Sequence, residues 1–242
     1  MADGRRKKRA LLCLLLLPVL ALLHGRDIPA IRNQEIETPG YIALTFDDSP
    51  NGKTTERLLD GLQARGAKAT FFLIGKQISG QEALVKRMAA EGHQVGNHTW
   101  THRRLDNTGV VGEQELEHTE AALHELLGGS GYWIRPPWGF ASAETLRETS
   151  VPLIYWSLDT EDWKTQDADR IAKIILEQAE NGDIVLLHDF YDTSVDGALK
   201  AIDLLQERGY QFVTLGELFE KMGVEPESGC LYCRPDRFRP VV

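Results

Sequence analysis

The chain has 242 residues, of which 42% are hydrophobic and 26% charged, and its formal net charge is −9. These proportions are ordinary for a globular protein and exclude a largely disordered or low-complexity chain. Residues 1–21 hold five basic residues and one acidic residue, so the rest of the chain carries a net charge of −13. That acidic body argues against a nucleic-acid partner, because binding to a phosphate backbone requires clustered Lys and Arg.

The N-terminus combines a basic segment, residues 5–9, with an apolar run at residues 10–23. Fourteen apolar residues are fewer than the roughly 20 that a membrane-spanning helix needs, and the basic flank favours a secretory signal peptide. An uncleaved membrane anchor is the alternative. We therefore expect an extracytoplasmic protein, either secreted or anchored to the cell membrane, whose membrane contact is confined to residues 1–26.

Beyond a polar linker at residues 27–39, short apolar segments alternate with amphipathic ones. The predicted strands are residues 42–46, 69–74, 94–97, 132–135, 153–158, 184–187 and 211–213. The predicted helices, in which apolar residues recur at helical spacing, are residues 54–65, 81–91, 113–127, 167–180, 196–208 and 215–222. This alternation predicts an α/β fold with a parallel sheet, either a barrel or an open doubly wound sheet. No Gly-x-Gly-x-x-Gly follows the first strand, so a dinucleotide-binding sheet has no support.

One globular domain is expected at residues 40–222, followed by a C-terminal tail at residues 223–242. Cys230 and Cys233 lie in that tail. In an oxidising compartment such a pair closes a small structural disulfide, and two inert thiols are the alternative. No second cysteine pair completes a four-thiolate zinc site.

Two adjacent carboxylates, Asp47 and Asp48, follow the first predicted strand. Like charges held side by side destabilise a fold unless they share a cation or a chemical task, although a solvated turn also fits this stretch alone. His98-Thr-Trp-Thr-His102 follows the third strand. Two histidines at this spacing can face one metal from a single helical turn, with a carboxylate as third ligand, and exposed helix histidines are the alternative.

Polar groups also follow the later strands. Arg135-Pro-Pro-Trp-Gly139 follows the fourth, Asp159-Thr-Glu-Asp162-Trp163 the fifth, and His188-Asp189 ends the sixth. An arginine such as Arg135 can clamp a carboxylate with two parallel hydrogen bonds. In parallel barrels the C-terminal ends of the strands form the rim where active sites are built. Five polar segments on one rim therefore indicate an active site.

The order and spacing of these segments resemble the five motifs of the polysaccharide deacetylases, the NodB-homology or carbohydrate esterase family 4 enzymes. The matching segments are Thr45-Phe-Asp-Asp-Ser-Pro50, His98-Thr-x-x-His102, Arg135-Pro-Pro-Trp-Gly139, Asp159-x-x-Asp162-Trp163 and Leu186-Leu-His188. The resemblance covers residues 40–220. It implies a distorted (β/α)7 barrel related to the TIM barrel, with one divalent metal ion, usually zinc.

The resemblance also implies a role for each site residue. Asp48, His98 and His102 would hold the metal. Asp47 would be the general base, oriented by Arg135, and His188 the general acid, its charge set by Asp162. Trp163 and Leu186 would line the acetyl pocket, and the backbone N–H near Trp138 would bind the oxyanion.

Two positions depart from the family pattern. Ser49 stands where the family commonly has Gly, which suits a positive φ better, so an altered turn is expected. Trp138 replaces the more usual Tyr, which leaves a backbone donor intact.

The implied activity is metal-dependent removal of N-acetyl groups from an N-acetylated polysaccharide, with N-acetylglucosamine of bacterial peptidoglycan as the first choice of substrate. Chitin oligosaccharides and acetylated xylan are alternatives. Glycoside hydrolysis would leave both histidines without a role. An inactive glycan-binding module would have lost the base or a ligand, and the sequence retains both. The sequence indicates no protein partner.

Overall fold

The computed structural model describes residues 40–105 and 109–239, which belong to a compact unit spanning Thr38–Val242. The expected signal or anchor at residues 1–26 and the linker at residues 27–39 lie outside the described residues. Within the described ranges, no helix combines the length and apolar character needed to cross a membrane.

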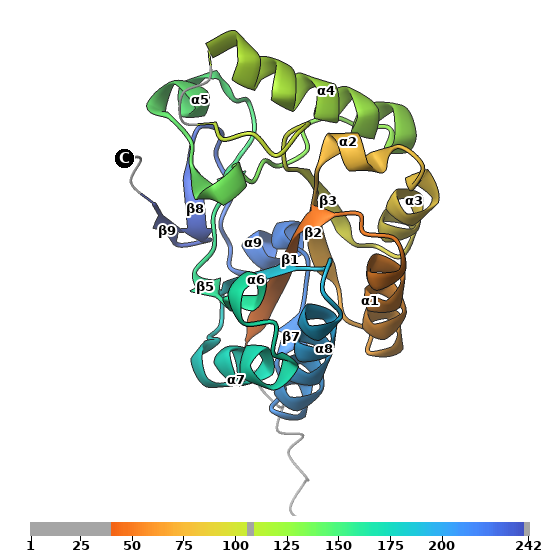
Figure 1. Ribbon diagram of the computed structural model, residues 1–242. Coiled ribbons are helices and arrows are strands. Elements are labelled where there is room, and N and C mark those ends of the chain that lie inside the picture. Colours follow the sequence, from red (N-terminus) through yellow and green to blue (C-terminus); the bar gives the residue numbers. More distant parts are fainter. Residues whose placement is uncertain (1–39, 106–108, 240–242) are drawn as a thin grey trace, which may run out of the picture. The chain divides into compact units, whose positions relative to one another are not determined.

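Strands and helices alternate over most of the described chain (Figure 1). The strands are β1 (Tyr41–Ser49), β2 (Ala69–Leu73), β3 (Gln94–Asn97), β4 (Leu153–Ile154), β5 (Leu158–Asp159), β6 (Ile184–His188), β7 (Gln211–Phe212), β8 (Leu231–Arg234) and β9 (Arg237–Phe238). The helices are α1 (Lys53–Ala64), α2 (Gly75–Ile78), α3 (Glu82–Ala90), α4 (Gly109–Leu127), the 3₁₀ turn η1 (Pro137–Gly139), α5 (Ala143–Glu148), α6 (Asp162–Thr165), α7 (Ala168–Gln178), α8 (Asp192–Glu207) and α9 (Leu215–Lys221).

Parallel pairing arranges the main strands in the order β3-β2-β1-β6-β5, and β7 pairs with the beginning of β1. Beyond β3 the strand path continues through Ile134, which bridges both Asn97 of β3 and Leu153 of β4. From β4 the chain runs directly into β5, at the other end of the strand order. This near-closed path is a distorted α/β barrel, as the sequence predicts, and not an open doubly wound sheet.

The first strand is buried on both faces, which accounts for its unbroken apolar run. Leu44 and Phe46 pack in one cluster with residues of α1, α7 and α8. Ala43 belongs to a second cluster with residues of α9. Strand β1 therefore forms the centre of the fold, and its C-terminal end is fixed in position by packing on both sides.

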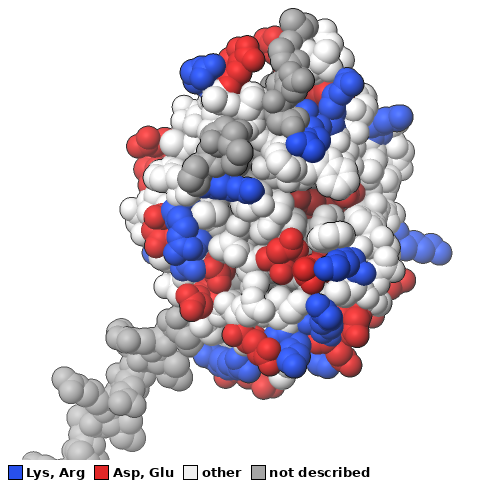
Figure 2. All heavy atoms as spheres, turned by 60° about the vertical axis from the view of Figure 1, so that its left-hand side comes forward, with Lys and Arg blue, Asp and Glu red and all other residues white. Residues whose placement is uncertain are grey.

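Charged pairs connect the outer helices at the surface. Arg65, which follows α1, makes two hydrogen bonds to the Asp203 carboxylate of α8, at 2.7 and 2.8 Å. On the face drawn in Figure 2, basic and acidic side chains are interleaved, and no patch of one sign covers it. Such exposed pairs contribute about 0–1 kcal/mol each, so burial of apolar residues dominates the stability of the fold.

The predicted fourth strand, residues 132–135, is wrong in extent, because only Ile134 forms bridges there. Gly128, Gly129 and Gly131 before it have positive φ values of 75°, 71° and 78°. After it, two prolines lack the N–H groups that a strand ladder requires. The segment is therefore too short to pair at more than one residue.

The predicted fifth strand, residues 153–158, is divided into β4 and β5. The segment predicted as a C-terminal tail, residues 223–242, contains β8 and β9 in its described part. Strand β8 from that segment pairs in parallel with β4. Tyr232 is only 1% exposed, and its ring meets Phe219 at 5.0 Å between centroids. The C-terminal segment therefore completes the core beside β4.

Cys230 and Cys233 are both free thiols, so this pair does not form the disulfide that was one of the two alternatives. Cys230 packs against the apolar cluster of α9, whereas the Cys233 thiol lies 3.4 Å from the carbonyl oxygen of Arg237. Side chains three residues apart in an extended segment point to opposite faces, which separates the two sulfur atoms.

Candidate active site

Side chains from four strand ends converge beside the tip of β1. Asp47 and Asp48 belong to the end of β1, and His188, the last residue of β6, is the register partner of Asp47. His98 follows β3 directly, and Arg135 follows the bridge at Ile134. The structure thus brings together segments that are up to 141 residues apart in the sequence, as the strand-end pattern predicts.

Asp48, His98 and His102 form a group whose ligand atoms all lie within 4.8 Å of one another. The Asp48 Oδ1 atom is 3.5 Å from His98 Nε2 and 3.4 Å from His102 Nε2. Two imidazole nitrogens and one carboxylate oxygen are a usual donor set for zinc and related divalent metals.

The hydrogen bonds around this group fit a cation. His98 Nδ1 lies 2.7 Å from the carbonyl oxygen of Arg135. A carbonyl oxygen only accepts, so Nδ1 carries the proton and Nε2 presents a lone pair towards Asp48. The buried Oδ1 of Asp48 has no hydrogen-bond partner. Lone pairs that face one another in this way repel unless a positive charge lies between them.

Burial also shifts the pKa values of the three candidate ligands. It lowers the pKa of His98 and of His102, although the negative charge of Asp47 opposes the shift in both. Both imidazoles are therefore neutral near pH 7, the form that binds metals. Burial raises the pKa of Asp48, and its electrostatic interaction with His98 opposes this shift. The residues present therefore fit a divalent metal ion.

The two histidines lie on a loop, so the prediction of a single helical turn is wrong. Thr99 and His102 have positive φ values of 67° and 62°, which a helix excludes. Helix α4 holds the loop, because both oxygens of Glu115 accept hydrogen bonds from Thr101, at 2.6 and 2.7 Å. Asn97 adds a second attachment by donating to the carbonyl oxygen of Leu116 at 3.0 Å.

The turn after β1 has its unusual conformation at Asp48 and not at Ser49. Asp48 has a φ of 64°, whereas Ser49 does not have a positive φ. A non-glycine residue in the left-handed region is strained by about 1–3 kcal/mol. The expectation that serine disturbs a positive-φ position is therefore wrong, because the strain falls on the candidate metal ligand itself.

Arg135 fixes the neighbouring carboxylate, Asp47. Its side chain is fully buried and donates one hydrogen bond from Nη1 to Asp47 Oδ1 at 2.8 Å. Nη1 also donates to the Thr45 hydroxyl at 2.7 Å, and Nη2 donates to the Tyr155 carbonyl oxygen at 2.8 Å. Arg135 thus does not form the two-bond clamp considered from the sequence. Burial lowers its pKa, and the charge of Asp47 opposes that shift.

His188 is paired with Asp162 on the opposite side of the site. Its Nδ1 lies 2.9 Å from Asp162 Oδ1, and its backbone N–H donates to Asp162 Oδ2 at 2.7 Å. Burial lowers the pKa of His188, but the hydrogen bond and charge of Asp162, followed by the charges of Asp47 and Asp48, outweigh burial and raise the pKa to about 9. The imidazole is therefore protonated at neutral pH.

The remaining site residues occupy different environments. Trp138 is 64% exposed, and its ring lies 5.0 Å from the His102 ring. Trp163 is 49% exposed and follows Asp162 at the start of α6. Leu186 is buried in β6, two residues before His188 and therefore on the same face of the strand.

Sequence reasoning missed several residues that hold this arrangement. Thr45 accepts a hydrogen bond from Arg135, and the buried Ser194 donates to Asp162 Oδ2 at 2.8 Å. Glu115, on α4, fixes the histidine loop. Thr45 lies two residues before Asp47 and so on the same strand face, which could have identified it. Ser194 and Glu115 are distant in sequence, and no pattern identifies them.

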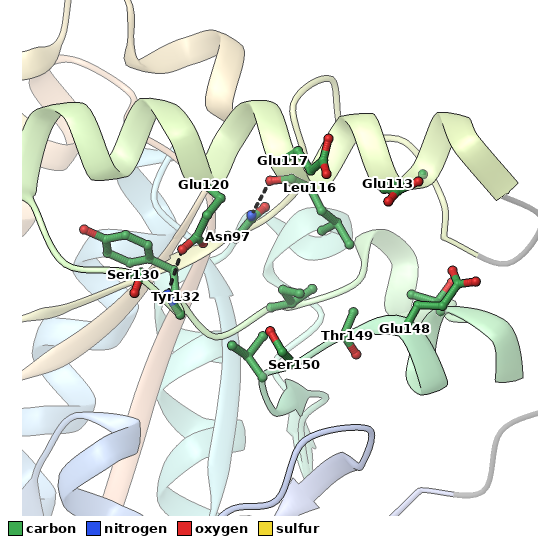
Figure 3. A pocket seen from close by; sticks show the side chains of 15 residues that line it. Asn97, Glu113, Leu116, Glu117, Glu120, Ser130, Tyr132, Glu148, Thr149 and Ser150 are labelled. Carbon is green, nitrogen blue, oxygen red and sulfur yellow. Dashed lines mark hydrogen bonds between the residues drawn. The ribbon is translucent and has the colours of Figure 1, made fainter.

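A separate cavity of about 720 Å³ lies between α4 and the segments around residues 130–134 and 145–151 (Figure 3). Glu113, Glu117 and Glu120 of α4 line one side of it, with Glu148 opposite. The candidate metal ligands and Asp47 do not line this cavity. It lies in the wall of the barrel where the predicted fourth strand is reduced to Ile134.

Comparison with known proteins identifies relatives of this chain. The polysaccharide deacetylase family matches residues 35–151. The chain is 40% identical over 191 residues to the peptidoglycan-N-acetylglucosamine deacetylase PgdA of Listeria monocytogenes, covering 78% of this chain and 41% of that protein. It is 38% identical over 190 residues to a peptidoglycan-N-acetylglucosamine deacetylase of Bacillus cereus, covering 74% of this chain and 68% of that protein.

A solved structure shows the same fold. A family 4 acetyl xylan esterase from Clostridium thermocellum, in complex with a cobalt ion, superposes with a TM-score of 0.77 at 29% identity. The superposition covers 81% of this chain and all of that one. The strand order, the converging strand ends and these similarities agree, and the chain belongs to the polysaccharide deacetylase family.

Proposed function

We propose that this chain is a metal-dependent hydrolase that removes N-acetyl groups from a glycan, with N-acetylglucosamine of bacterial peptidoglycan as its substrate. The supporting observation is that Asp47, held by Arg135, and His188, held by Asp162, lie at the paired ends of β1 and β6. A base and an acid fixed side by side suit the hydrolysis of an amide, which requires both.

The base acts first in the proposed reaction. Asp48, His98 and His102 would hold a divalent ion, zinc in this proposal, which would supply polarisation of the amide carbonyl and a lowered pKa of the attacking water. Arg135 occupies Oδ1 of Asp47, so Oδ2 accepts the proton of that water. The water oxygen forms the new bond to the carbonyl carbon. The backbone N–H of Trp138 stabilises the oxyanion, a contribution of about 3–4 kcal/mol for one donor.

The acid completes the reaction. His188 is protonated at neutral pH because of Asp162, and it donates its proton to the sugar nitrogen. The C–N bond then breaks, and the products are acetate and a free amino sugar. Leu186, on the same strand face as His188, and Trp163 provide apolar surface for the acetyl methyl group.

The glycan assignment rests on two kinds of support. Exposed indole rings at Trp138 and Trp163 provide flat apolar faces of the kind that stack against sugar rings. The relatives of Listeria and Bacillus cereus are peptidoglycan deacetylases, although the chain spans only 41% of the Listeria protein. Chitin oligosaccharides and acetylated xylan remain competing substrates, since ester and amide hydrolysis use the same groups.

Acetate release tests this proposal. Purified protein with zinc is incubated separately with peptidoglycan, chitin oligosaccharides and acetylated xylan, and acetate is measured. We expect the highest kcat/KM with peptidoglycan, and Asp47→Asn serves as the inactive control. Higher activity on another substrate would change the substrate assignment, and binding to glycan without acetate release would favour a non-catalytic module.

We also propose export of the protein, supported by the basic residues 5–9 before the apolar run at residues 10–23. Peptidoglycan lies outside the cytoplasmic membrane, so export and substrate agree. Cell fractionation tests this point. Full-length protein recovered only in the cytosol, with residues 1–26 intact, would contradict it.

A further inference from the structure

A further buried carboxylate, Asp189, lies next to His188 and has no part in the proposed reaction. It follows His188, is fully buried, and accepts hydrogen bonds from two neutral side chains. The donors are the Thr55 hydroxyl and the Asn51 amide, the latter at 2.6 Å. Burial raises the pKa of Asp189, and these bonds oppose the shift. A buried acid without a reaction to perform calls for another explanation.

The hydrogen bonds of Asp189 lead directly to a candidate metal ligand. The same nitrogen of Asn51 that donates to Asp189 also donates to the carbonyl oxygen of Asp48 at 2.8 Å. In the orientation that satisfies both ends of its amide, Gln77 donates to this oxygen as well, at 3.0 Å. Two side-chain amides therefore hold the carbonyl group of Asp48. Because the carbonyl group is part of the backbone, these bonds also restrict the backbone conformation of Asp48.

Asp48 requires such support because its φ of 64° lies in the left-handed region. A non-glycine residue stays in that conformation only where its surroundings impose it. If Asp48 relaxed to a negative φ, its carbonyl would turn away from Asn51, and its carboxylate would leave His98 and His102. The bond from Asn51 thus opposes the rotation that would break up the ligand group.

The chemistry of Asp189 explains why an acid is needed at this position. A carboxylate only accepts, so the nitrogen of the Asn51 amide must face it, and one hydrogen remains for Asp48. Thr55 is oriented by the same rule, since its oxygen accepts from the Asn51 backbone N–H at 2.7 Å and its hydrogen goes to Asp189. With an amide in place of Asp189, either end of Asn51 could face it.

We propose that Asp189 and Asn51 are positioning residues that hold Asp48 in its left-handed conformation for metal binding. The proposal rests on the proposed function to the extent that it takes Asp48 as a metal ligand. Outer partners of metal ligands commonly change affinity by about 10–100-fold when they are removed. We expect a loss of this size in the zinc affinity of Asn51→Ala and of Asp189→Asn.

Zinc affinity, measured by competition with a chromophoric chelator, tests the proposal without any assay of activity. Asn51 is only partly buried and Asp189→Asn preserves shape, so both variants should fold, as circular dichroism will check. The matched control is Gln81→Ala. Gln81 binds the same turn through the Pro50 carbonyl at 3.0 Å and the Gly52 N–H at 2.6 Å, but it does not contact Asp48. Its zinc affinity should equal that of the wild type.

The double variant separates positioning from a general loss of structure. If Asp189 acts through Asn51, the affinity of the double variant should equal that of Asn51→Ala alone, because the effects of coupled residues do not add. Wild-type affinity in folded Asn51→Ala would overturn the proposal, as would strictly additive losses or an equal loss in Gln81→Ala. Wild-type protein that binds no zinc would overturn the proposed function together with this inference.

Discussion

The adjacent carboxylates Asp47 and Asp48 are chemically identical residues in different surroundings. Asp47 is held by the Arg135 guanidinium, whereas Asp48 faces two imidazole nitrogens with an oxygen that lacks any hydrogen bond. Surroundings of this kind assign different tasks to like groups, as they do in other hydrolases that use paired carboxylates. The two residues should therefore respond differently to the same substitution.

Asp48→Asn should lose zinc, whereas Asp47→Asn should retain it, since only Asp48 belongs to the ligand group. The amide at position 47 can still accept a hydrogen bond from Arg135 but cannot take a proton from water. General base catalysis contributes about 10²–10⁴-fold, which is the expected loss in kcat for Asp47→Asn. Zinc content and acetate release of both variants provide the measurement. Zinc lost from Asp47→Asn and retained by Asp48→Asn would reverse the roles.

The pairing of His188 with Asp162 should determine the alkaline limit of activity. The pKa of His188 rises from its ordinary 6.5 to about 9, so the wild type should lose activity as the pH rises through about 9. In Asp162→Asn the negative charge is absent and burial lowers the pKa, so the loss should begin at a lower pH. The pH profile of kcat/KM for both proteins checks this. An unchanged alkaline limit would exclude Asp162 as the source of the shift.

The same pKa shift has a consequence for stability. A group with a raised pKa in the folded state contributes stability that is fully present below its unfolded pKa of about 6.5 and is lost as the pH rises through about 9. The free energy of unfolding of the wild type should therefore fall between these values. In Asp162→Asn this part of the decrease should be smaller.

Strand β8 is only four residues long, but it contributes two buried side chains to the core. Leu231 is buried beside Leu153, its register partner in β4. Leu231→Ala should lower the free energy of unfolding by about 2–5 kcal/mol, the usual range for a buried leucine. Glu225→Ala, at an exposed position before β8, is the control and should change it by less than about 0.5 kcal/mol. Both changes are measured by urea unfolding. An equal decrease in the free energy of unfolding for Leu231→Ala and Glu225→Ala would mean that the segment is not part of the cooperative core.

The elements that the sequence predicts well are those whose pattern reflects local burial. Strand β1 is apolar because both its faces are buried, and the leucines of α1 lie on one buried face. The length of a polar-ended strand is harder to predict, as Ile134 illustrates, because it depends on glycines and prolines outside the strand. Strand β8 has only two buried apolar residues, and its partner lies far away in the sequence.

The candidate site shows the same limit. The proposed ligands and catalytic residues could be selected from motifs at strand ends, but their geometry depends on distant contacts. The histidine loop takes its form from Glu115 on α4, and Asp162 is held by Ser194 on α8. Spacing alone suggested a helix for His98 and His102, because it carries no information about positive φ values. Contacts between distant elements leave no periodic pattern in a sequence.

For the whole molecule, metal binding should raise the free energy of unfolding. A ligand that binds only the folded state adds about 2.7 kcal/mol to the free energy of unfolding at 100 times its dissociation constant. Removing zinc with a chelator should therefore lower Tm, and returning it should restore Tm. Asp48→Asn should show no zinc-dependent change in Tm, which distinguishes the ligand group from surface carboxylates. A zinc-dependent rise in Asp48→Asn would point to a different metal site.

The pairing of Asp47 with His188 across β1 and β6 also bears on how such an enzyme can diversify. Neighbouring strands lie about 4.8 Å apart, a spacing determined by backbone hydrogen bonds that no side-chain substitution alters. Trp138 and Trp163, in contrast, lie on short connections after the strands, which tolerate insertion and exchange. New glycans could be accommodated by replacing those connections, while the distance between the proposed base and the proposed acid is inherited unchanged.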